Sequence, residues 1–493
     1  MNFTKKSFAF MIIIIIFLSV FSACAGGSDE KNPVNENEKN SIDSKSGEEF
    51  ESGTNAAVMT PDLPESDFGG IEFRILLSGW SGVDFDIEEI TGERLDDAIY
   101  LRNRKIEEKY NIVIKTYNMD NFDSFGSSSD SYRKAARAGA DDYDVFFGIQ
   151  QYSLVDSMEG LNVEYNGNLP YIDLNKPWWD RGILDVCYGD KVYFAAGDIT
   201  HSTLGYTTLL LFNKNMFEEI GQEYPYQSVK DGTWTYDKFV GIIKNLSRDL
   251  NGDGQMKQQD DLYTISGWQY ELPYNFHTVL GGNEVIKDEN GYPKIDIFSE
   301  RSMAALDKTL DLFSEYGGYY NNKDYGVCRK MFMNRQLYFL DIRMFEIARY
   351  GFRDMTDDFG MIPHPKLSES EPYYTQLVNN NVVTVTTVPV TNTKLEITSI
   401  LLEAMAYEGQ KTISPEYKEV LLQTKMTRDD ESAEMFDYIW GHRTYRYGLV
   451  AFDNVLNAKV IGKGERGYVS VYESLLTKAE TEIEKIKEFF FTD

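Results

Sequence analysis

Residues 176–213 read KPWWDRGILDVCYGDKVYFAAGDITHSTLGYTTLLLFN, and this stretch decides the predicted fold. A short strand-like run at 191–196 is followed by a polar loop at 197–205. A second apolar run rich in β-formers covers 206–212 and leads into a helix. Two β-like runs that are joined by a polar segment are expected where a chain crosses between two lobes. The stretch therefore predicts a two-lobed protein.

The same stretch contains a tandem pair, Trp178 and Trp179, beside Asp180 and Arg181. Flat rings next to charged hydrogen-bonding groups suit the wall of a sugar site, because a sugar offers an apolar C–H face to a ring and hydroxyls to polar groups. Large aromatic side chains are also usually buried, so core packing at a lobe edge is the alternative. The sequence leaves both interpretations open.

Composition limits the function classes. The 493 residues, of which 42% are hydrophobic, are too many for one ordinary domain. The formal net charge of -30 repels phosphate backbones, so no nucleic-acid partner is expected. The four histidines (His201, His277, His364 and His442) lack zinc-ligand spacing. Cys187 and Cys328 are compatible with either a disulfide or two buried thiols.

The N-terminus indicates export. Lys5 and Lys6 precede an apolar run at 8–20 that is too short to cross a membrane comfortably as a helix. Ser22–Ala23–Cys24 resembles a bacterial lipobox, although Phe21 stands where an aliphatic residue is usual. The resemblance implies a signal peptide at 1–23, a lipid on Cys24 and residence on the extracellular face of the membrane. An ordinary secretory signal is the alternative. Residues 24–68 predict a disordered acidic tether.

The first part of the folded body predicts a parallel sheet. Strands are expected at 71–77, 112–117 and 143–148, with helices at 91–110 and 131–140 between them. This β-α-β-α-β order indicates a sheet covered by helices. Further elements are expected as helices at 213–220, 238–250, 299–315, 344–350, 394–408, 415–424, 432–440 and 470–490, strands at 264–268, 359–363 and 382–390, a hairpin at 287–297, and a second crossing at 336–341.

A calcium loop is expected at 249–260, which reads DLNGDGQMKQQD. Its side chains match positions 1, 3, 5 and 12 of such a loop, its glycine matches position 6, and one backbone carbonyl would add a ligand. An acidic glycine turn without metal is the alternative. The residues of the predicted structural calcium site are Asp249, Asn251, Asp253, Gln255 and Asp260.

Candidate ligand-binding residues lie at predicted strand ends, turns and crossings, where ligand groups tend to be placed. For each of them core packing is the alternative. The candidates for ring stacking are Trp80, Trp178, Trp179 and Trp268. The candidates for hydrogen bonding are Glu93, Gln150, Gln151, Asp198, His201, Asp341 and Arg343.

Several motifs together resemble the carbohydrate-binding branch of bacterial extracellular solute-binding lipoproteins of ABC importers. They are RLDDAIYLRNRKIEEKYNI at 94–112, KPWWD at 176–180, KVYFAAGDI at 191–199, LLLFNK at 209–214, WTYDKF at 234–239 and FGMIPHPK at 359–366. The resemblance implies an α/β fold like class II periplasmic binding proteins, with two lobes joined by hinge crossings around a cleft. Residues 69–190 and 345–390 would form lobe I, and 200–340 and 392–493 lobe II.

The resemblance implies a monomeric, non-enzymatic protein that captures a carbohydrate and delivers it to a membrane permease. Two other functions stay open. A secreted glycoside hydrolase would need two carboxylates about 5–5.5 Å or 6.5–9.5 Å apart, and a surface adhesin would bind glycan without handing it on. The G-x-G-x-x-G match at 462–467 lies too near the end of the sequence for the strand and acid of a dinucleotide site.

Overall fold

The computed structural model describes residues 59–78, 85–119, 126–321, 325–378, 383–422, 430–446, 449–452, 455 and 467–492. The predicted signal peptide, Cys24 and Trp80 lie outside the described residues. The chain divides into two units, 1–59 and 60–493, and everything below concerns the second. Leu63 and Phe68, expected in the disordered tether, pack against the hydrophobic core. The folded part therefore begins before residue 69, because these two apolar side chains find partners.

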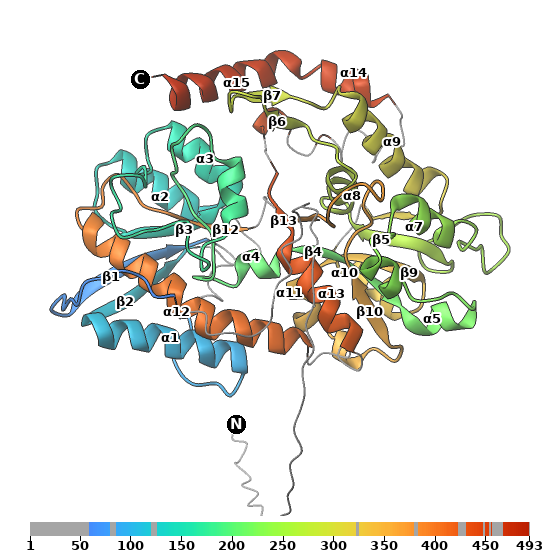
Figure 1. The fold of residues 1–493 in the computed structure, drawn as a ribbon, viewed down its shortest axis with the longest axis horizontal. Coiled ribbons are helices and arrows are strands. Elements are labelled where there is room, and N and C mark those ends of the chain that lie inside the picture. The colour runs from blue at the N-terminus through green and yellow to red at the C-terminus, as the bar shows by residue number, and fades with distance from the viewer. Residues whose placement is uncertain are drawn as a thin grey trace, which may run out of the picture. The chain divides into compact units, whose positions relative to one another are not determined.

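The first sheet confirms the predicted β-α-β order (Figure 1). Its strand order is β12-β3-β1-β2, with β1 parallel to β2 and β3, and β12 antiparallel to β3. The strands are β1 (Ile71–Leu77), β2 (Ile112–Asn118), β3 (Val145–Ile149) and β12 (Thr384–Thr387), and the helices of this part are α1 (Arg94–Tyr110), α2 (Ser127–Arg137) and α3 (Gln150–Met158).

Side chains alternate across this sheet with the strand period of two residues. Phe73, Ile75 and Leu77 of β1 belong to a core cluster with residues of α1 and of α12 (Leu395–Leu422). Leu76 lies in another cluster with residues of α2, such as Tyr132. Both faces of the sheet are therefore covered by helices, as expected for parallel strands.

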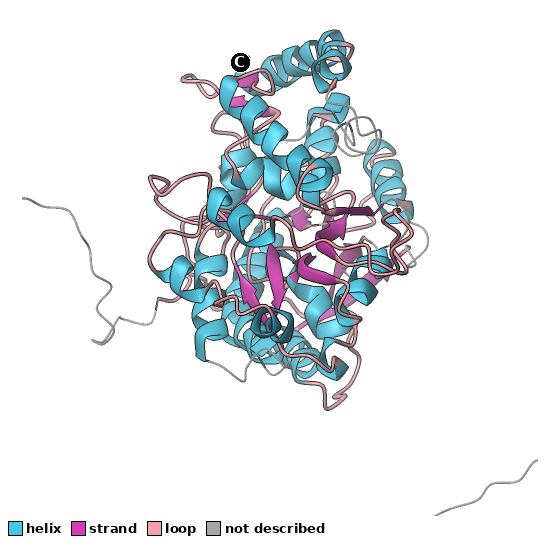
Figure 2. Cartoon of the chain, turned by 90° about the vertical axis from the view of Figure 1, so that its right-hand side faces the viewer, coloured by secondary structure: helices cyan, strands magenta, loops and turns pink. Residues whose placement is uncertain are grey.

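The second sheet has the strand order β10-β4-β9-β5-β8. β4 is antiparallel to β9 and β10, whereas β9, β5 and β8 run parallel. The strands are β4 (Thr208–Asn213), β5 (Tyr263–Trp268), β8 (Tyr319–Asn321), β9 (Leu337–Arg343) and β10 (Phe359–Ile362). Helices flank the strands (Figure 2). They include α5 (Lys214–Glu219), α6 (Tyr226–Lys230), α7 (Tyr236–Ile243), α8 (Leu272–Val279), α10 (Tyr325–Met333), α11 (Met344–Arg349) and α13 (Asp430–Gly441).

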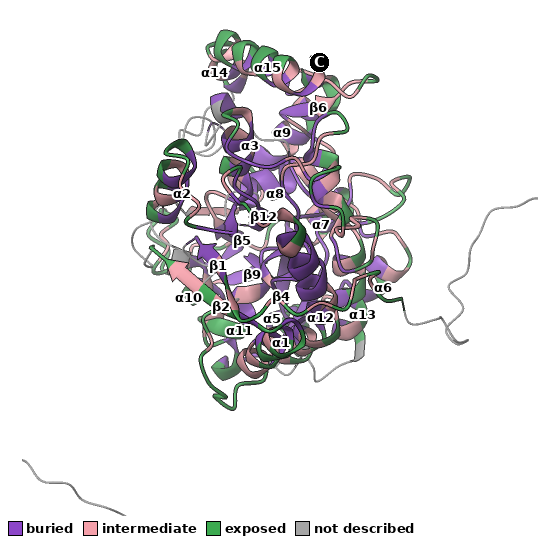
Figure 3. Ribbon diagram, turned by 90° about the vertical axis from the view of Figure 1, so that its left-hand side faces the viewer, coloured by how far each residue is buried: buried purple, intermediate pink, exposed green. Residues whose placement is uncertain are grey.

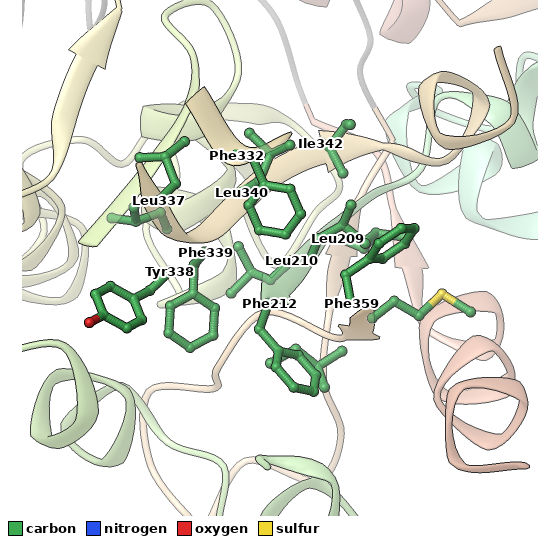
Figure 4. Packing of buried hydrophobic residues seen from close by; sticks show 14 of the residues in the cluster. Leu209, Leu210, Phe212, Phe332, Leu337, Tyr338, Phe339, Leu340, Ile342 and Phe359 are labelled. Atoms are coloured by element: carbon green, nitrogen blue, oxygen red, sulfur yellow. The ribbon is translucent and has the colours of Figure 1, made fainter. Parts of the chain in front are cut away.

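Two expectations about this sheet are wrong. The run at 336–341 is no crossing, because β9 lies between β4 and β5 inside the sheet. The strand at 359–363 was assigned to lobe I, but β10 pairs with β4 of the second sheet. Leu210, Phe212, Phe339 and Phe359 pack together in its core (Figure 4). Both runs are apolar because both strands are buried along their whole length, β9 inside the sheet and β10 at its edge. A buried apolar run does not show in the sequence which sheet it joins or whether it crosses between lobes.

Two connections between the sheets lie side by side. The chain leaves the first sheet before β4 and returns to it at β12, and isolated bridges join these two segments at Ala195–Thr386 and at Thr207–Val378. The expected crossing before β4 is confirmed, but its first part, 191–196, forms isolated bridges rather than a strand. We call 195–207, together with Val378 and residues 383–386, the paired crossings. A small apolar cluster, including Phe194, Tyr206 and Val385, packs around them.

A single helix, α12 (Leu395–Leu422), replaces the two helices expected at 394–408 and 415–424. Pro415 lies inside it. Leu401 and Met405 of α12 pack in the core of the first sheet, whereas its Tyr417 and Leu421 belong to the core of the second. Tertiary packing at both ends therefore keeps the helix continuous through the proline, which by itself favours a break.

The two C-terminal helices form a separate apolar cluster with α9 and the β6–β7 hairpin. The elements of this cluster are β6 (Val285–Lys287), β7 (Pro293–Ile295), α9 (Glu300–Ser314), α14 (Tyr468–Glu473) and α15 (Leu476–Phe491). Figure 3 shows exposed residues along α15 and buried ones in strands such as β5 and β9. Cys187 and Cys328 are both free, buried thiols. Among the described residues, no helix has the length and apolar character needed to span a bilayer.

Candidate functional site

Arg343 occupies the last position of β9, at the carboxyl end of a strand that runs parallel to β5. Its Nε donates to Glu346 at 3.0 Å, and its NH1 lies 3.4 Å from Glu271. Arg329 makes a second ion pair with Glu346. Burial and the nearby Glu271 carboxylate raise the pKa of Glu346 well above its usual value. Two guanidinium groups therefore balance two carboxylates in a nearly dry environment, which fixes Arg343 in place.

Three aromatic rings surround this guanidinium. Its central carbon lies 4.9 Å from the ring centroid of Phe345 and 5.5 Å from those of Tyr206 and Trp268. Trp268 ends β5, and it and Phe345 are only partly buried, whereas Arg343 is 5% exposed. We call Tyr206, Trp268, Glu271, Arg343, Phe345 and Glu346 the strand-edge cluster. It presents two partly exposed rings that are oriented by buried ion pairs, an arrangement suited to stacking on a flat apolar ligand face.

Asp341 lies two residues earlier on β9 and is buried beneath this cluster. Its carboxylate accepts from Asn275 at 2.9 and 3.0 Å and lies 2.7 Å from Nε2 of His364. Nδ1 of His364 lies 2.8 Å from Oε1 of Gln376. Gly267, just before Trp268, packs so closely on Asp341 that a Cβ would lie 2.8 Å from the aspartate Cβ. Asp341 therefore packs against the end of β5 and helps to fix the position of Trp268. The sequence placed Trp268, Asp341 and Arg343 separately, and the fold brings them together.

Gln150 and Gln151 begin α3, directly after the carboxyl end of β3. The Gln150 backbone amide donates to the carbonyl of Val383 in the paired crossings at 3.1 Å. Its side-chain Oε1 is buried and accepts no hydrogen bond within the described residues. Gln151 is partly buried. Gln150 thus carries a buried acceptor without a partner, at the sheet edge where a ligand donor would be useful.

Asp198 and His201 lie on the first paired crossing and face α12. The Asp198 carboxylate accepts from Ser414 at 2.7 Å, and burial raises its pKa to about 6. His201 stacks on Tyr417 with ring centroids 5.3 Å apart. Glu93 is exposed just before α1 and makes no capping bond. These contacts connect the crossing to α12, so they favour a positioning role for Asp198 and His201.

Trp178 and Trp179 are 1% and 3% exposed. Their indole N–H groups donate to the two oxygens of Glu403 in α12, at 2.9 and 2.7 Å. Gly197 of the crossing packs against them so tightly that a Cβ would meet the Trp178 carbonyl at 2.3 Å. These contacts favour the packing interpretation that the sequence left open beside the stacking one.

The predicted calcium loop is held by its own backbone. Asp249 accepts from the amides of Gly252 and Gly254, both at 2.7 Å. Asp253 pairs with Lys257, which brings a cation of the chain itself to this carboxylate. Within the described residues, no group of three or more acidic, His or Cys side chains gathers as a metal site. The turn geometry expected from the glycines is present, but convergent carboxylates are not, so calcium stays a prediction.

Several residues of the site were not anticipated from the sequence. Glu346 follows Arg343 by three positions at the start of α11, a spacing at which opposite charges meet on a helix, and this could have been noticed. Tyr206, Glu271 and Phe345 carry no comparable signal. They approach Arg343 because the paired crossings and β5 end at the same place as β9.

No protein-family model matches the sequence, and no curated protein is similar to it. Solved structures do match the fold. An ABC substrate-binding protein from Listeria monocytogenes in complex with cycloalternan has a TM-score of 0.53 at 13% identity, covering 85% of this chain and 98% of its own. The GacH receptor of Streptomyces glaucescens, solved unliganded and with acarbose, has 0.54 at 14%, covering 85% and 99%.

A maltose/maltodextrin-binding domain from Bdellovibrio bacteriovorus, bound to maltotriose, has a TM-score of 0.51 at 15% identity, covering 84% of this chain and 100% of its own. At such identities the likeness concerns the fold. This likeness agrees with the two sheets, with the paired crossings that join them and with the candidate ligand-binding residues at the strand ends. The protein has the two-lobed α/β fold of ABC-transporter substrate-binding proteins.

Proposed function

We propose that the protein is the substrate-binding component of an ABC importer and that it captures a carbohydrate. The observation that carries this proposal is the strand-edge cluster, where Trp268 and Phe345 offer partly exposed rings beside Arg343. Rings bind the C–H face of a sugar, and fixed charged groups bind its hydroxyls. The solved proteins of the same fold include complexes with maltotriose and cycloalternan, which supports a sugar ligand.

Capture would occur by movement of one sheet and its helices against the other. The paired crossings are short, and the bridges at Ala195–Thr386 and Thr207–Val378 hold them together at both ends. A rotation about these crossings would change the separation between Gln150, at the start of α3, and Arg343, at the end of β9. Hinge closure of this kind buries a ligand without chemical change. The permease would then receive the ligand when the lobes open.

Binding without cleavage is supported by the state of the carboxylates in the cluster. Glu271 and Glu346 both contact the Arg343 guanidinium, and Glu346 also pairs with Arg329. A glycosidase needs one carboxyl free to protonate the leaving group and a second free to attack or to activate water. In this cluster both carboxylates are engaged by guanidinium groups, which supports a positioning role for them.

A thermal-shift screen with neutral and acidic oligosaccharides, followed by chromatography of the mixtures, tests the function. A ligand that binds only the folded protein raises its melting temperature. We expect a shift with at least one oligosaccharide and recovery of that sugar intact. Shortened products would indicate a hydrolase, and the absence of any shift would contradict sugar binding.

We propose further that the protein is tethered to the outer face of the membrane through Cys24. The small residues before this cysteine and the acidic stretch after it support this proposal. Metabolic labelling with a fatty-acid analogue should mark the wild type and leave Cys24→Ser unlabelled, with the variant released from the membrane fraction. Equal membrane retention and no labelling of the wild type would contradict a lipid anchor.

We propose calcium as a structural ligand of the 249–260 loop, supported by the loop spacing and by the turn at Gly252 and Gly254. A metal that binds only the folded protein stabilises it by about 2.7 kcal/mol when the free metal concentration is a hundred times the dissociation constant. Adding a chelator should therefore lower the melting temperature, and Asp249→Asn should remove that response. A melting temperature that changes neither on chelation nor on addition of calcium would contradict the calcium site. The positive charge beside Asp253 would then come from Lys257.

A further inference from the structure

The C-terminal end of α15 contacts both the segment before the first paired crossing and the β6–β7 hairpin. The Phe489 and Phe490 rings lie 5.5 and 5.8 Å from Tyr193, which precedes the first paired crossing. The Phe491 ring lies 4.3 Å from Tyr292, in the turn of the β6–β7 hairpin. Lys191 donates to the Phe489 carbonyl at 3.2 Å. These contacts fix the position of α15 relative to α3, which also packs on this C-terminal cluster through Met158.

A groove of about 1110 Å³ separates α3 from α15. One wall is the second half of α3, with Val155 and Met158. The other wall is α15, from Thr477 through Thr481 and Lys485 toward the C-terminus. These positions are four residues apart, so they lie on one face of the helix. The face is exposed, whereas the opposite face, with Ile483 and Ile486, is buried. The 16 residues of α15 give the groove a length of about 24 Å.

The groove offers hydroxyls together with both signs of charge. Besides the threonines, it contains Lys478, Lys485 and the carboxylates of Glu159, Glu482 and Glu488. Neither lysine has an ion-pair partner within the part of the chain that the structure describes. Glu159 pairs with Arg137, which leaves the carboxylates of Glu482 and Glu488 against two ammonium groups, so the groove is close to neutral and does not favour a polyanion. Its lining is partly apolar and partly polar, which suits a ligand that has both kinds of surface. A neutral ligand that carries many hydroxyls matches such a mixture of donors and acceptors.

We propose that the groove between α3 and α15 is a second binding region, separate from the strand-edge cluster, that takes part of a long neutral oligosaccharide. The proposal rests on the proposed sugar-binding function and specifies its substrate class. Val155, Met158 and the partly exposed Phe489 supply apolar contact for sugar rings, while the threonines and charged groups bind hydroxyls. The groove volume lies just above the usual range of small-ligand pockets, about 300–1,000 Å³, which suits several linked rings rather than one.

The test is titration calorimetry of the purified protein with linear neutral oligosaccharides of increasing length and with an acidic series of equal lengths. Thr481→Trp fills the groove from the α15 wall. Glu480→Trp is the matched control, since Glu480 is exposed on the same helix and does not line the groove. Melting temperatures and circular dichroism establish that both variants fold.

In the wild type and in Glu480→Trp, affinity should increase with length. Thr481→Trp should bind the longest neutral sugar about tenfold more weakly and the shortest one normally. The acidic series should show less gain with length. A normal length dependence in Thr481→Trp, or none in the wild type, would overturn the second region while leaving sugar binding intact. No binding of any oligosaccharide would overturn both proposals.

Discussion

Trp178–Trp179 and Trp268 began as equivalent candidates for stacking on a sugar, and the fold separates them. The tandem pair is buried, and both indoles donate to one carboxylate, that of Glu403. Trp268 ends a strand, stays partly exposed and lies beside a guanidinium. The difference comes from partners far away in the sequence. Glu403 arrives on α12, and Arg343 arrives on β9, so neighbouring residues alone could not assign the roles.

The largest expected difference between the two regions is in stability. Trp178→Ala removes a fully buried ring and leaves Glu403 with one indole donor instead of two, so the free energy of unfolding should fall by about 3–5 kcal/mol. Trp268→Ala should cost about 1 kcal/mol, because its ring is partly exposed and makes one cation–π contact. Urea unfolding of both variants measures this. Equal losses would erase the distinction between a core pair and a site residue.

A second prediction uses the pH dependence of the buried region. Burial raises the pKa of Glu403 to about 7 from an ordinary 4.5, although the two indoles partly offset this. Between these pH values the folded protein keeps a proton that the unfolded chain has lost, so this group's contribution to stability falls as pH rises toward 7. The size is roughly 2–3 kcal/mol.

Glu403→Gln removes the titrating group. The unfolding free energy of this variant should therefore lack the pH-dependent contribution of Glu403. Urea unfolding of the wild type and of the variant, below and above this pH range, measures how the unfolding free energy of each protein changes with pH. The variant should also be less stable than the wild type at low pH, since an amide offers only one acceptor to two indoles. Identical slopes in the two proteins would show that Glu403 keeps its ordinary ionisation.

The smallest expected effect concerns binding. Trp268→Ala should weaken the affinity for the oligosaccharide found in the screen by about 0.5–1.5 kcal/mol, or roughly two- to tenfold, because a stacked ring contributes that much beyond its buried area. Trp268→Phe keeps a ring and should recover part of the loss. Calorimetry measures both variants, and unchanged affinity in Trp268→Ala would remove this residue from the site.

Much of the local structure could be predicted from the sequence. The strands 71–77 and 264–268 and the helix at 299–315 follow from periodicity. The structure adds that Ser299 caps this helix by accepting from the Ser302 amide. Thr235 likewise caps α7. These features depend on residues a few positions apart, for which apolar spacing and hydrogen-bonding side chains are sufficient signals.

Long-range pairing was harder to predict. Residues 337–343 form the centre of a sheet rather than a crossing, because a continuous apolar run has the same appearance in either place. Pro415 was expected to begin a second helix at 415–424, yet contacts with two different cores keep α12 continuous through it. In both cases the decisive partners are tens to hundreds of residues away, and no local pattern records them.

The sequence by itself determined the class of architecture, the alternation of the first sheet and the crossing before β4, since these depend on short-range periodicity and on motifs carried within single segments. Only the tertiary structure decided which polar residues meet. Trp268, Asp341 and Arg343 converge because β5 and β9 end at one edge, while Glu403 of α12 commits the tandem tryptophans to the interior. Side-chain roles follow from contacts, and contacts between distant segments are formed only when the chain folds.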